Sequence, residues 1–457
     1  MCQKYIGCGK CSKSYIYILL GFVLKTLDDN FFTFTSVAPK METNIFGINP
    51  VLSKHMLIQN FYKYISFIIG GTIFLFIIIK KNTKEQKTRN FLLSDIKASS
   101  SFRELPRLLQ YKKDPIHKPI LEIIIVSMIY VLHFEVLDIL YTFKISNLSF
   151  WTLEILFIII FLKKYFVIKF YNFQKCSFIF FVSSVTLLLM VSINLPLKVT
   201  EQNQTKCYDI LFSLVDKKYI LFILAFIFIN FNHAFISYAR VKAKVLMDFK
   251  YIYPYTLIFF IGIFGIIITS IELTFSSLYE CGEKYQDFCM VASLDGNNNL
   301  YLDNITIYFN GLKEKKLTEL IIELVILLPI FLIINFFESV CEFLVIIKLN
   351  PIFVLIQNNF AYGINYLIYV IFKFDHKYKS EMLNQFFVIE TGEIIGIICY
   401  MIYLEIIELR FCGLDTYLNR NLLLLSTAES QITDDENIEE DIDKNTDYTL
   451  YSEPTIY

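Results

Sequence analysis

Long apolar runs separated by short polar or basic segments form the dominant pattern of the chain. A run of about 20 apolar residues is what a helix needs to cross a hydrocarbon core about 30 Å thick. The pattern therefore predicts an all-α, polytopic membrane protein with about ten spans. These are expected at residues 14–34, 57–79, 119–143, 148–168, 176–197, 219–238, 254–275, 318–340, 351–372 and 384–408, within a membrane domain covering residues 1–427.

The first of these runs, "SYIYILLGFVLKTLDDNFFTF", is the least apolar because it contains Lys25, Asp28 and Asp29. Lysines precede it, so a cleaved signal peptide is the alternative reading. No small-residue cleavage pattern follows the apolar part, and we therefore expect an uncleaved span.

The distribution of Lys and Arg predicts the orientation of the spans. The segment 80–118 is the most basic part of the chain, and basic loops stay in the cytoplasm. Alternation from there places segments 163–175 and 239–250, and both termini, on the cytoplasmic side. The basic stretch "KFDHKYK" at 373–379 falls outside in this scheme and does not fit it.

Sequons and cysteines test this orientation independently. The acceptor patterns at Asn147, Asn203 and Asn304 all fall on the predicted outer side. We expect glycans at Asn203 and Asn304. Asn147 is left out because it lies too close to the membrane to be glycosylated. The ten cysteines are scattered, but Cys281 and Cys289 are close in sequence within the outer segment 276–317. They are predicted to form a disulfide, with Cys207 as a competing partner.

Composition narrows the functional class. The chain is 55% hydrophobic with a mean hydropathy of +0.52, and its net charge is −1. The first two values exclude a soluble enzyme, and the third gives no basic field for nucleic acid. No nucleotide-binding loop or hydrolase motif is visible, so we expect no enzyme activity and no cofactor. The "CGKC" at 8–11 lacks a fourth ligand, so we expect no metal. The acidic tail 428–457 is predicted to be a disordered cytoplasmic segment.

Ten spans with cytoplasmic termini resemble the layout of the drug/metabolite transporter superfamily. Residues 138–192, from "DILYTFKISNLSFWTLEILFIIIFLKKYF", and residues 232–265, from "NHAFISYARVKAKVLMDFKYIYPYT", are similar to nucleotide-sugar-transporter-like members. The resemblance implies two inverted five-helix halves and a nucleotide sugar or another phosphorylated solute as substrate. The chain departs from that pattern in its fifth span, where Ser183-Ser184 replace the usual glycine.

Polar residues inside the predicted spans are the candidate binding residues, because a charge in lipid is costly unless it faces a cavity or a partner. The alternatives for each are helix packing by hydrogen bonds or wetting at the membrane surface. Tyr130 and Asp138 share a helical face, and Lys25 is the best cation for a phosphate. The candidate set is Lys25, Tyr130, Asp138, Asn232, His233, Glu338, Asn358 and Glu393. In the tenth span, Gly392 and Gly396 are expected to serve close helix packing.

The sequence therefore predicts a secondary transporter that moves a small polar metabolite by alternating access. A proton-coupled cation is the second substrate class. The alternative function is a non-transporting receptor or scaffold. Expected partners are the lipid bilayer, a small-molecule solute and a second copy of the chain in a homodimer. The expected location is an endomembrane (Golgi or endoplasmic reticulum) or the plasma membrane.

Overall fold

The structure of the protein is a computed structural model. It describes residues 11–35, 50–85, 119–142, 151–165, 175–177, 179–184, 218–248, 250, 252–280, 291–292, 300–301, 303–373, 391–392, 394–399 and 401–402.

The described elements are helices, apart from one short antiparallel hairpin. In chain order they are α2 (Cys11–Thr35), η1 (Val51–Lys54), α3 (Met56–Glu85), α5 (Pro119–Thr142), α6 (Trp151–Tyr165), α9 (Lys218–Asp248), α10 (Pro254–Leu278), β1 (Val291–Ala292), β2 (Leu300–Tyr301), α11 (Ile305–Lys313), α12 (Leu317–Ile321), η5 (Ile322–Leu327), α13 (Leu328–Lys348) and α14 (Pro351–Lys373). Short helical pieces lie within 175–184 and 391–402. Each of the ten predicted runs thus contains described helix, and the all-α prediction is confirmed for these residues.

Within the part of the chain that the structure describes, four helices are long and apolar enough to cross a membrane: Met56–Lys80, Pro119–Val136, Pro254–Leu278 and Leu317–Lys348. Their outward side chains are large hydrophobics, and Ile73, Ile267 and Ile333 are each more than half exposed. Such side chains are stable against lipid and costly in water. The chain therefore has the features of an integral membrane protein. The count of ten spans stays a prediction.

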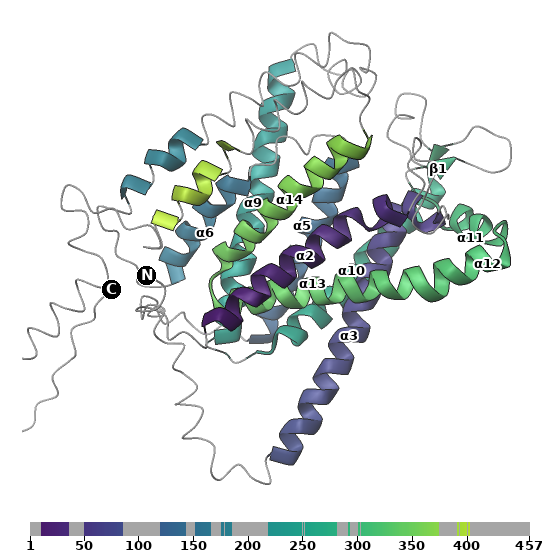
Figure 1. Cartoon of the computed structure of the whole chain (residues 1–457), viewed down its shortest axis with the longest axis horizontal. Coiled ribbons are helices and arrows are strands. Elements are labelled where there is room, and N and C mark those ends of the chain that lie inside the picture. The colour runs from purple at the N-terminus through teal and green to yellow at the C-terminus, as the bar shows by residue number, and fades with distance from the viewer. Residues whose placement is uncertain are drawn as a thin grey trace, which may run out of the picture.

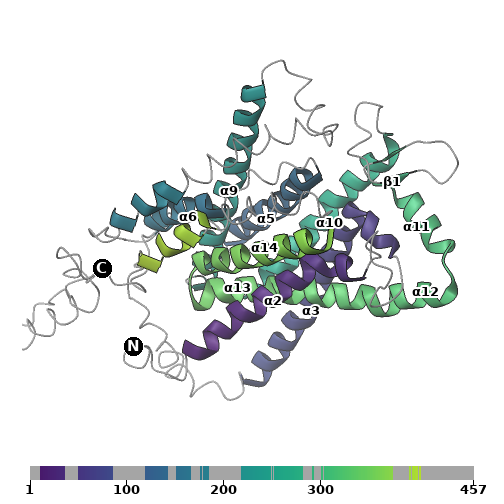
Figure 2. The same ribbon diagram turned by 45° about the horizontal axis from the view of Figure 1, so that its top comes forward.

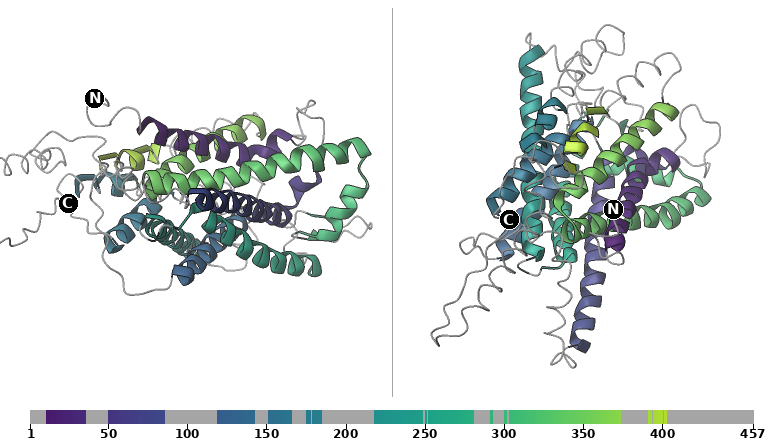
Figure 3. Two further views of the ribbon diagram at one scale, coloured as in Figure 1. Left: turned by 90° about the horizontal axis from the view of Figure 1, so that it is seen from below. Right: turned by 60° about the vertical axis from the view of Figure 1, so that its left-hand side comes forward.

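The helices form two groups joined by α13. On one side α2 and α14 pack against α13, and on the other α5 and α6 pack against α9. Helix α13 also contacts α3, α9 and α10. Seen from below, α2, α13, α3 and α10 follow one another as successive layers (Figure 3, left). Helix α13 is therefore the element that links residues of the two groups.

Helices α3 and α10 pack most closely where glycines remove side chains. A Cβ on Gly262 would lie 2.9 Å from the backbone oxygen of Tyr64, and one on Gly265 would lie 2.2 Å from the Tyr64 ring. On α3, a Cβ on Gly71 would lie 3.0 Å from Phe259 Cβ. Small residues allow helix backbones to approach in membranes. These glycines therefore fix the α3–α10 contact.

A single continuous helix runs through α12, η5 and α13, from Leu317 to Lys348. Its η5 segment, Ile322–Leu327, is π-helical and ends just before Pro329. Proline has no N–H to donate and its ring collides with the carbonyl four residues earlier. A π-helical turn is a common way for a long helix to accept such a disruption. The helix extends beyond the predicted span 318–340 at its inner end.

The segment 239–250, expected to lie between two spans, is not a loop, and its placement on the cytoplasmic side stays a prediction. Helix α9 continues to Asp248, and the side chains of Arg240, Lys242 and Lys244 are at most 5% exposed. The density of basic residues indicated a solvated loop because Lys and Arg are mostly found at surfaces. Here carboxylates and backbone carbonyls from other helices compensate these residues.

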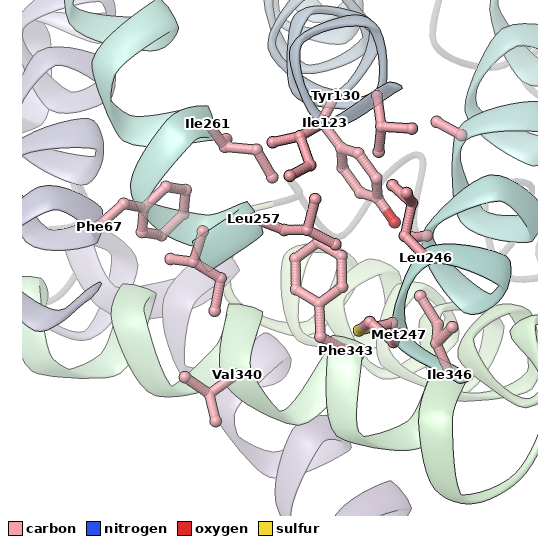
Figure 4. Close-up of a cluster of buried hydrophobic side chains, with 14 of the residues drawn as sticks. Phe67, Ile123, Tyr130, Leu246, Met247, Leu257, Ile261, Val340, Phe343 and Ile346 are labelled. Carbon is pink, nitrogen blue, oxygen red and sulfur yellow. The ribbon is translucent and has the colours of Figure 1, made fainter. Parts of the chain in front are cut away.

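The core lies where α13 meets α5, α9 and α10. Phe343 of α13, Leu257 of α10 and Tyr130 of α5 converge in this cluster (Figure 4). The Tyr130 and Phe343 rings are 5.3 Å apart between centroids. All three side chains are at most 1% exposed. This packing holds the α5 and α13 polar residues described below at fixed positions.

The predicted outer end is closed by Asp303, whose side chain is fully buried. Its Oδ1 lies 2.6 Å from His55 Nδ1, and its Oδ2 accepts hydrogen bonds from the N–H groups of Leu57 (2.8 Å) and Ile58 (3.2 Å). Those N–H groups belong to the first turn of α3, which has no intrahelical acceptor for them. Asp303 therefore caps α3 from a distant part of the chain.

A second carboxylate, Glu323, joins the same end. It accepts a 3.1 Å hydrogen bond from the Leu52 N–H and pairs with Lys315. Tyr308 packs edge-on against His55, with ring centroids 5.2 Å apart. Burial raises the pKa of the Tyr308 hydroxyl, and its hydrogen bond to Tyr62 acts in the same direction, so it stays neutral. The described residues of segment 276–317 include α11 and the β1–β2 hairpin.

The opposite end carries its own ion pairs. Glu122, at the start of α5, lies 2.5 Å from Lys250 Nζ and 3.4 Å from Lys242 Nζ. The start of α5 and the end of α9 therefore meet at one end of the bundle. The start of α3 and the end of α10 meet at the other end, at Asp303. Figure 2 shows α11 and α12 beside the end of α10 that holds Asp303.

Candidate functional site

A line of charged side chains crosses the interior between the two helix groups. We call it the central polar network. It consists of Lys25, Asp28 and Asp29 on α2, Asn335, Glu338 and Glu342 on α13, His133 on α5, Glu154 on α6, and Asn232, His233 and Arg240 on α9.

The first part of the network joins α2 to α13. Lys25 Nζ lies 3.0 Å from Asp29 Oδ1 and 3.3 Å from Glu338 Oε1. One turn earlier on α13, Asn335 Nδ2 donates a 2.7 Å hydrogen bond to Asp28 Oδ1. Asn365 of α14 donates to Asp29 Oδ2 at 2.5 Å. Three helices therefore meet at the α2 charges, and within α2 Lys25 pairs with Asp29.

These charges lie near the middle of their helices. Lys25 is 10 residues from the end of α2 at Thr35, and Glu338 is 10 residues from the end of α13 at Lys348. At 1.5 Å per residue this places both about 15 Å from a helix end. That is half of a hydrocarbon core of about 30 Å. The pair therefore lies midway along both helices, with the Lys25 side chain 25% exposed and the Glu338 side chain 13% exposed.

Three buried oxygen atoms around this pair have no hydrogen-bond partner among the described residues. They are Glu338 Oε2, Asn335 Oδ1 and Gln357 Oε1. Gln357 packs against α2 one turn before Lys25, because a Cβ on Gly21 would lie 2.6 Å from its amide. An unsatisfied buried polar atom costs about 1–3 kcal/mol. Such atoms call for water or a ligand that donates hydrogen bonds.

The second part of the network centres on Arg240. Its guanidinium pairs with Glu154 of α6, and its Nε donates a 3.0 Å hydrogen bond to Glu342 Oε1 of α13. Arg240 is 3% exposed and Glu154 is fully buried. The hydroxyl-bearing ring of Tyr130 faces the same charges. A buried cation is stable only when it is paired in this way.

Two histidines adjoin Arg240. His233 Nδ1 lies 3.4 Å from Glu154 Oε2, and the His133 and His233 rings are 6.4 Å apart between centroids. Asn232 lies beside His133. Each of these three side chains is at most 8% exposed. The histidine pair therefore lies inside the bundle, between α5 and α9.

The charges of the network do not balance. With Lys63 of α3, which acts on Asp28, its described cations are Lys25, Lys63 and Arg240. Its described carboxylates are Asp28, Asp29, Glu154, Glu338 and Glu342. Three positive and five negative charges leave a net charge of −2 when all are ionised. Uncompensated charge is costly in a low-dielectric interior. The site therefore favours protons or a cation over a further anion.

The structure brings together most of the predicted binding residues. Lys25, Tyr130, Asn232, His233 and Glu338 all lie in or beside the network. Asn358 is half-buried on α14, one residue after Gln357. Asp138 lies on α5, but its side chain is outside the described residues, as are Glu393, Asn203, Cys281 and Cys289. Their predicted roles stay predictions.

The contacts of Lys25 and Asn304 make their predicted roles less favourable. Lys25 was expected to bind a phosphate, but it already contacts two carboxylates. Asn304 was expected to carry a glycan, but its side chain is 7% exposed and caps α11 by accepting from the Thr306 and Ile307 N–H groups. A glycan on Asn304 would have to displace this buried cap.

Glu154 and Arg240 are the main residues that sequence reasoning missed. Glu154 interrupts the apolar run of the fourth span in "WTLEILF", and that isolated charge was the available signal. Arg240 was assigned to a loop. By contrast Glu135, also in a span, is satisfied by Tyr64, Asn60 and Thr269 and serves helix packing.

Ser184 donates a hydrogen bond to the backbone carbonyl of Gly392, and both residues are buried. The predicted fifth and tenth spans therefore contact each other here. Close helix packing through Gly392 and Gly396 stays a prediction.

The chain matches no known protein-family model and no curated protein. Among the described residues, no group of three or more His, Cys, Asp or Glu is arranged to hold a metal ion. The central polar network is therefore the candidate functional site.

Proposed function

We propose that the chain is a secondary transporter that moves a small polar solute by alternating access, with the central polar network as its binding site. The observation that carries this proposal is the Lys25–Glu338 pair and the spare oxygen acceptors beside it. A purely structural ion pair in lipid would be expected to satisfy its neighbours. Here the surrounding acceptors are available for a solute.

The same atoms favour one class of solute. Glu338 Oε2, Asn335 Oδ1 and Gln357 Oε1 accept hydrogen bonds and donate none,. A solute with ammonium or hydroxyl groups supplies the missing donors, and an ammonium also offsets part of the net negative charge. A phosphate-bearing solute would add negative charge where Lys25 is already paired. A cationic or hydroxyl-rich solute therefore fits better than a nucleotide sugar.

The test is uptake into proteoliposomes from a mixed pool of amines, amino acids, sugars and nucleotide sugars, with retained solutes identified by mass spectrometry. Wild-type protein is expected to accumulate a donor-bearing solute above protein-free vesicles. Glu338→Gln should abolish that accumulation per inserted molecule. The matched control is Glu280→Gln, which alters an exposed carboxylate hydrogen-bonded to Tyr301 at 3.0 Å, and it should transport normally.

Two outcomes would overturn the proposal. No accumulation by wild-type protein above empty vesicles would favour the receptor or scaffold alternative. Equal uptake by wild type and Glu338→Gln would remove the network from the transport path.

A further inference from the structure

We infer that His233 and Glu154 form a proton-binding site that couples solute movement to a proton gradient. This inference rests on the proposed transport function, because it names the coupling ion of the same network. Proton binding itself can be measured without any transport, so the two ideas can fail separately.

The geometry places one proton between two named atoms. His233 Nδ1 and Glu154 Oε2 are 3.4 Å apart, and both side chains are fully buried. The other carboxylate oxygen, Glu154 Oε1, is held by Arg240. A protonated imidazole next to a carboxylate forms an ion pair, whereas a neutral one leaves the carboxylate to Arg240 alone.

The helix backbones hold this arrangement in place. The Ser237 hydroxyl lies 2.7 Å from the His233 carbonyl and 3.2 Å from the Glu154 carbonyl. It therefore bridges α9 to α6 one turn after His233. This contact fixes the distance between imidazole and carboxylate without using either side chain.

Charge explains why a proton is needed there. Arg240 contacts two carboxylates, Glu154 and Glu342. One cation and two anions leave one negative charge in a buried place. A proton on His233 makes this group of four neutral, without removing any contact. The cost of an uncompensated charge in the interior is then avoided.

The neighbouring helices carry other titratable groups that could compete for this proton. Helix α5 presents Tyr130 and His133, α13 presents Glu342, and α2 presents Lys25, which acts on His133. The described side chains of α14 include no titratable residue. His133 shares its surroundings with two cations, Arg240 and Lys25, and with the second imidazole. Of these two histidines, His233 is the one that lies beside a carboxylate, that of Glu154.

The proton site is connected to the solute site through α13. Glu342, which shares Arg240 with Glu154, is one turn from Glu338, which holds Lys25. Protonation of His233 adds an ion pair between its imidazolium and the Glu154 carboxylate. Arg240 can then interact more strongly with Glu342. That change alters the charge felt one turn away at Glu338. Proton binding and solute binding are thereby linked through neighbouring carboxylates of one helix.

The chain offers a built-in reporter for the test. Trp151 is its only tryptophan and lies three residues before Glu154 in the first turn of α6. Intrinsic fluorescence of purified protein should therefore change with pH across about pH 5 to 8, where histidines titrate. His233→Gln and Glu154→Gln should each lose this change. His55→Gln is the matched control, because it removes a buried histidine next to the Asp303 carboxylate and leaves the network intact; it should keep the change.

A second measurement covers the case in which the variants do not fold. The chain has five histidines, so wild-type protein labelled at histidine Cε1 should give five NMR signals, assigned by substituting the other four. The His233 signal should shift with the fluorescence. A fluorescence change that survives in both His233→Gln and Glu154→Gln, or a His233 signal that does not move with pH, would overturn the inference. Loss of the change in His55→Gln would do the same.

Uptake then separates the two claims. A protein that takes up solute but shows no His233 titration would refute coupling at this pair and leave the transporter proposal intact. A protein that titrates as expected but takes up no solute would refute the transporter proposal and with it the coupling, and would leave only proton binding at this pair.

Discussion

Glu338 and Glu342 lie one turn apart on α13 and bind cations from opposite sides of the bundle. Glu338 holds Lys25 of α2 at 3.3 Å, and Glu342 holds Arg240 of α9 at 3.0 Å. One helix therefore carries the charge contact between the two helix groups. Any movement of the groups relative to each other has to strain or exchange one of these pairs.

Substitutions of Lys25 and Glu338 are expected to have non-additive effects on the stability of the protein. Lys25→Met leaves two carboxylates without their cation, the largely buried Glu338 and the exposed Asp29, which should destabilise the protein by about 2 kcal/mol. The double variant Lys25→Met/Glu338→Gln removes one of those charges and should recover part of the loss. Thermal unfolding in detergent compares four proteins: wild type, Lys25→Met, Glu338→Gln and the double variant. Additive effects of the two substitutions would show that the pair does not interact.

Asp303 is expected to hold the outer end together. Asp303→Ala removes the acceptor for the Leu57 and Ile58 N–H groups and the partner of His55. We expect a loss of about 3 kcal/mol, because buried donors are left unsatisfied. The control is Glu280→Gln, an exposed outer carboxylate that should unfold at the wild-type temperature. Equal unfolding temperatures for Asp303→Ala and wild type would contradict the capping role.

The α3–α10 contact is expected to tolerate no added side chain at Gly262. Gly262→Ala places a methyl group 2.9 Å from the Tyr64 backbone oxygen, and backbone cannot rotate away as a side chain can. A cost of about 2 kcal/mol is expected for such overpacking. Ile267→Ala on the exposed face of the same helix is the control and should change stability little. An unchanged unfolding temperature for Gly262→Ala would show that the helices can separate there.

The sequence predicted the positions of the helices better than the contacts between them. Apolar runs indicated α5 and α14 to within one residue at either end and α10 to within three, because the bilayer demands about 20 apolar residues in a row. The structure adds that Lys25 and Asp29, four residues apart on α2, form an ion pair,. Contacts between distant segments gave no local signal. Asp303 caps a helix that begins 247 residues earlier, at Met56.

Arg240 shows why the rest of the site was missed. Counting Lys and Arg treats them as surface residues, and three of them in five positions at 240–244 indicated a loop,. The carboxylates that stabilise Arg240 in the interior come from α6 and α13. Only the packing of three helices brings those charges together. A buried ion pair is therefore visible in the sequence only as two isolated charges in apolar runs.

The central claim is that the network serves alternating access. The most direct measurement is counterflow: proteoliposomes are preloaded with the solute retained from the mixed pool, and entry of the same labelled solute is followed with no gradient of pH or voltage. We predict that preloading accelerates entry for wild type and for Glu280→Gln, and that Glu338→Gln abolishes the acceleration at equal protein content. Entry that is independent of preloading, or acceleration that survives in Glu338→Gln, would contradict the account.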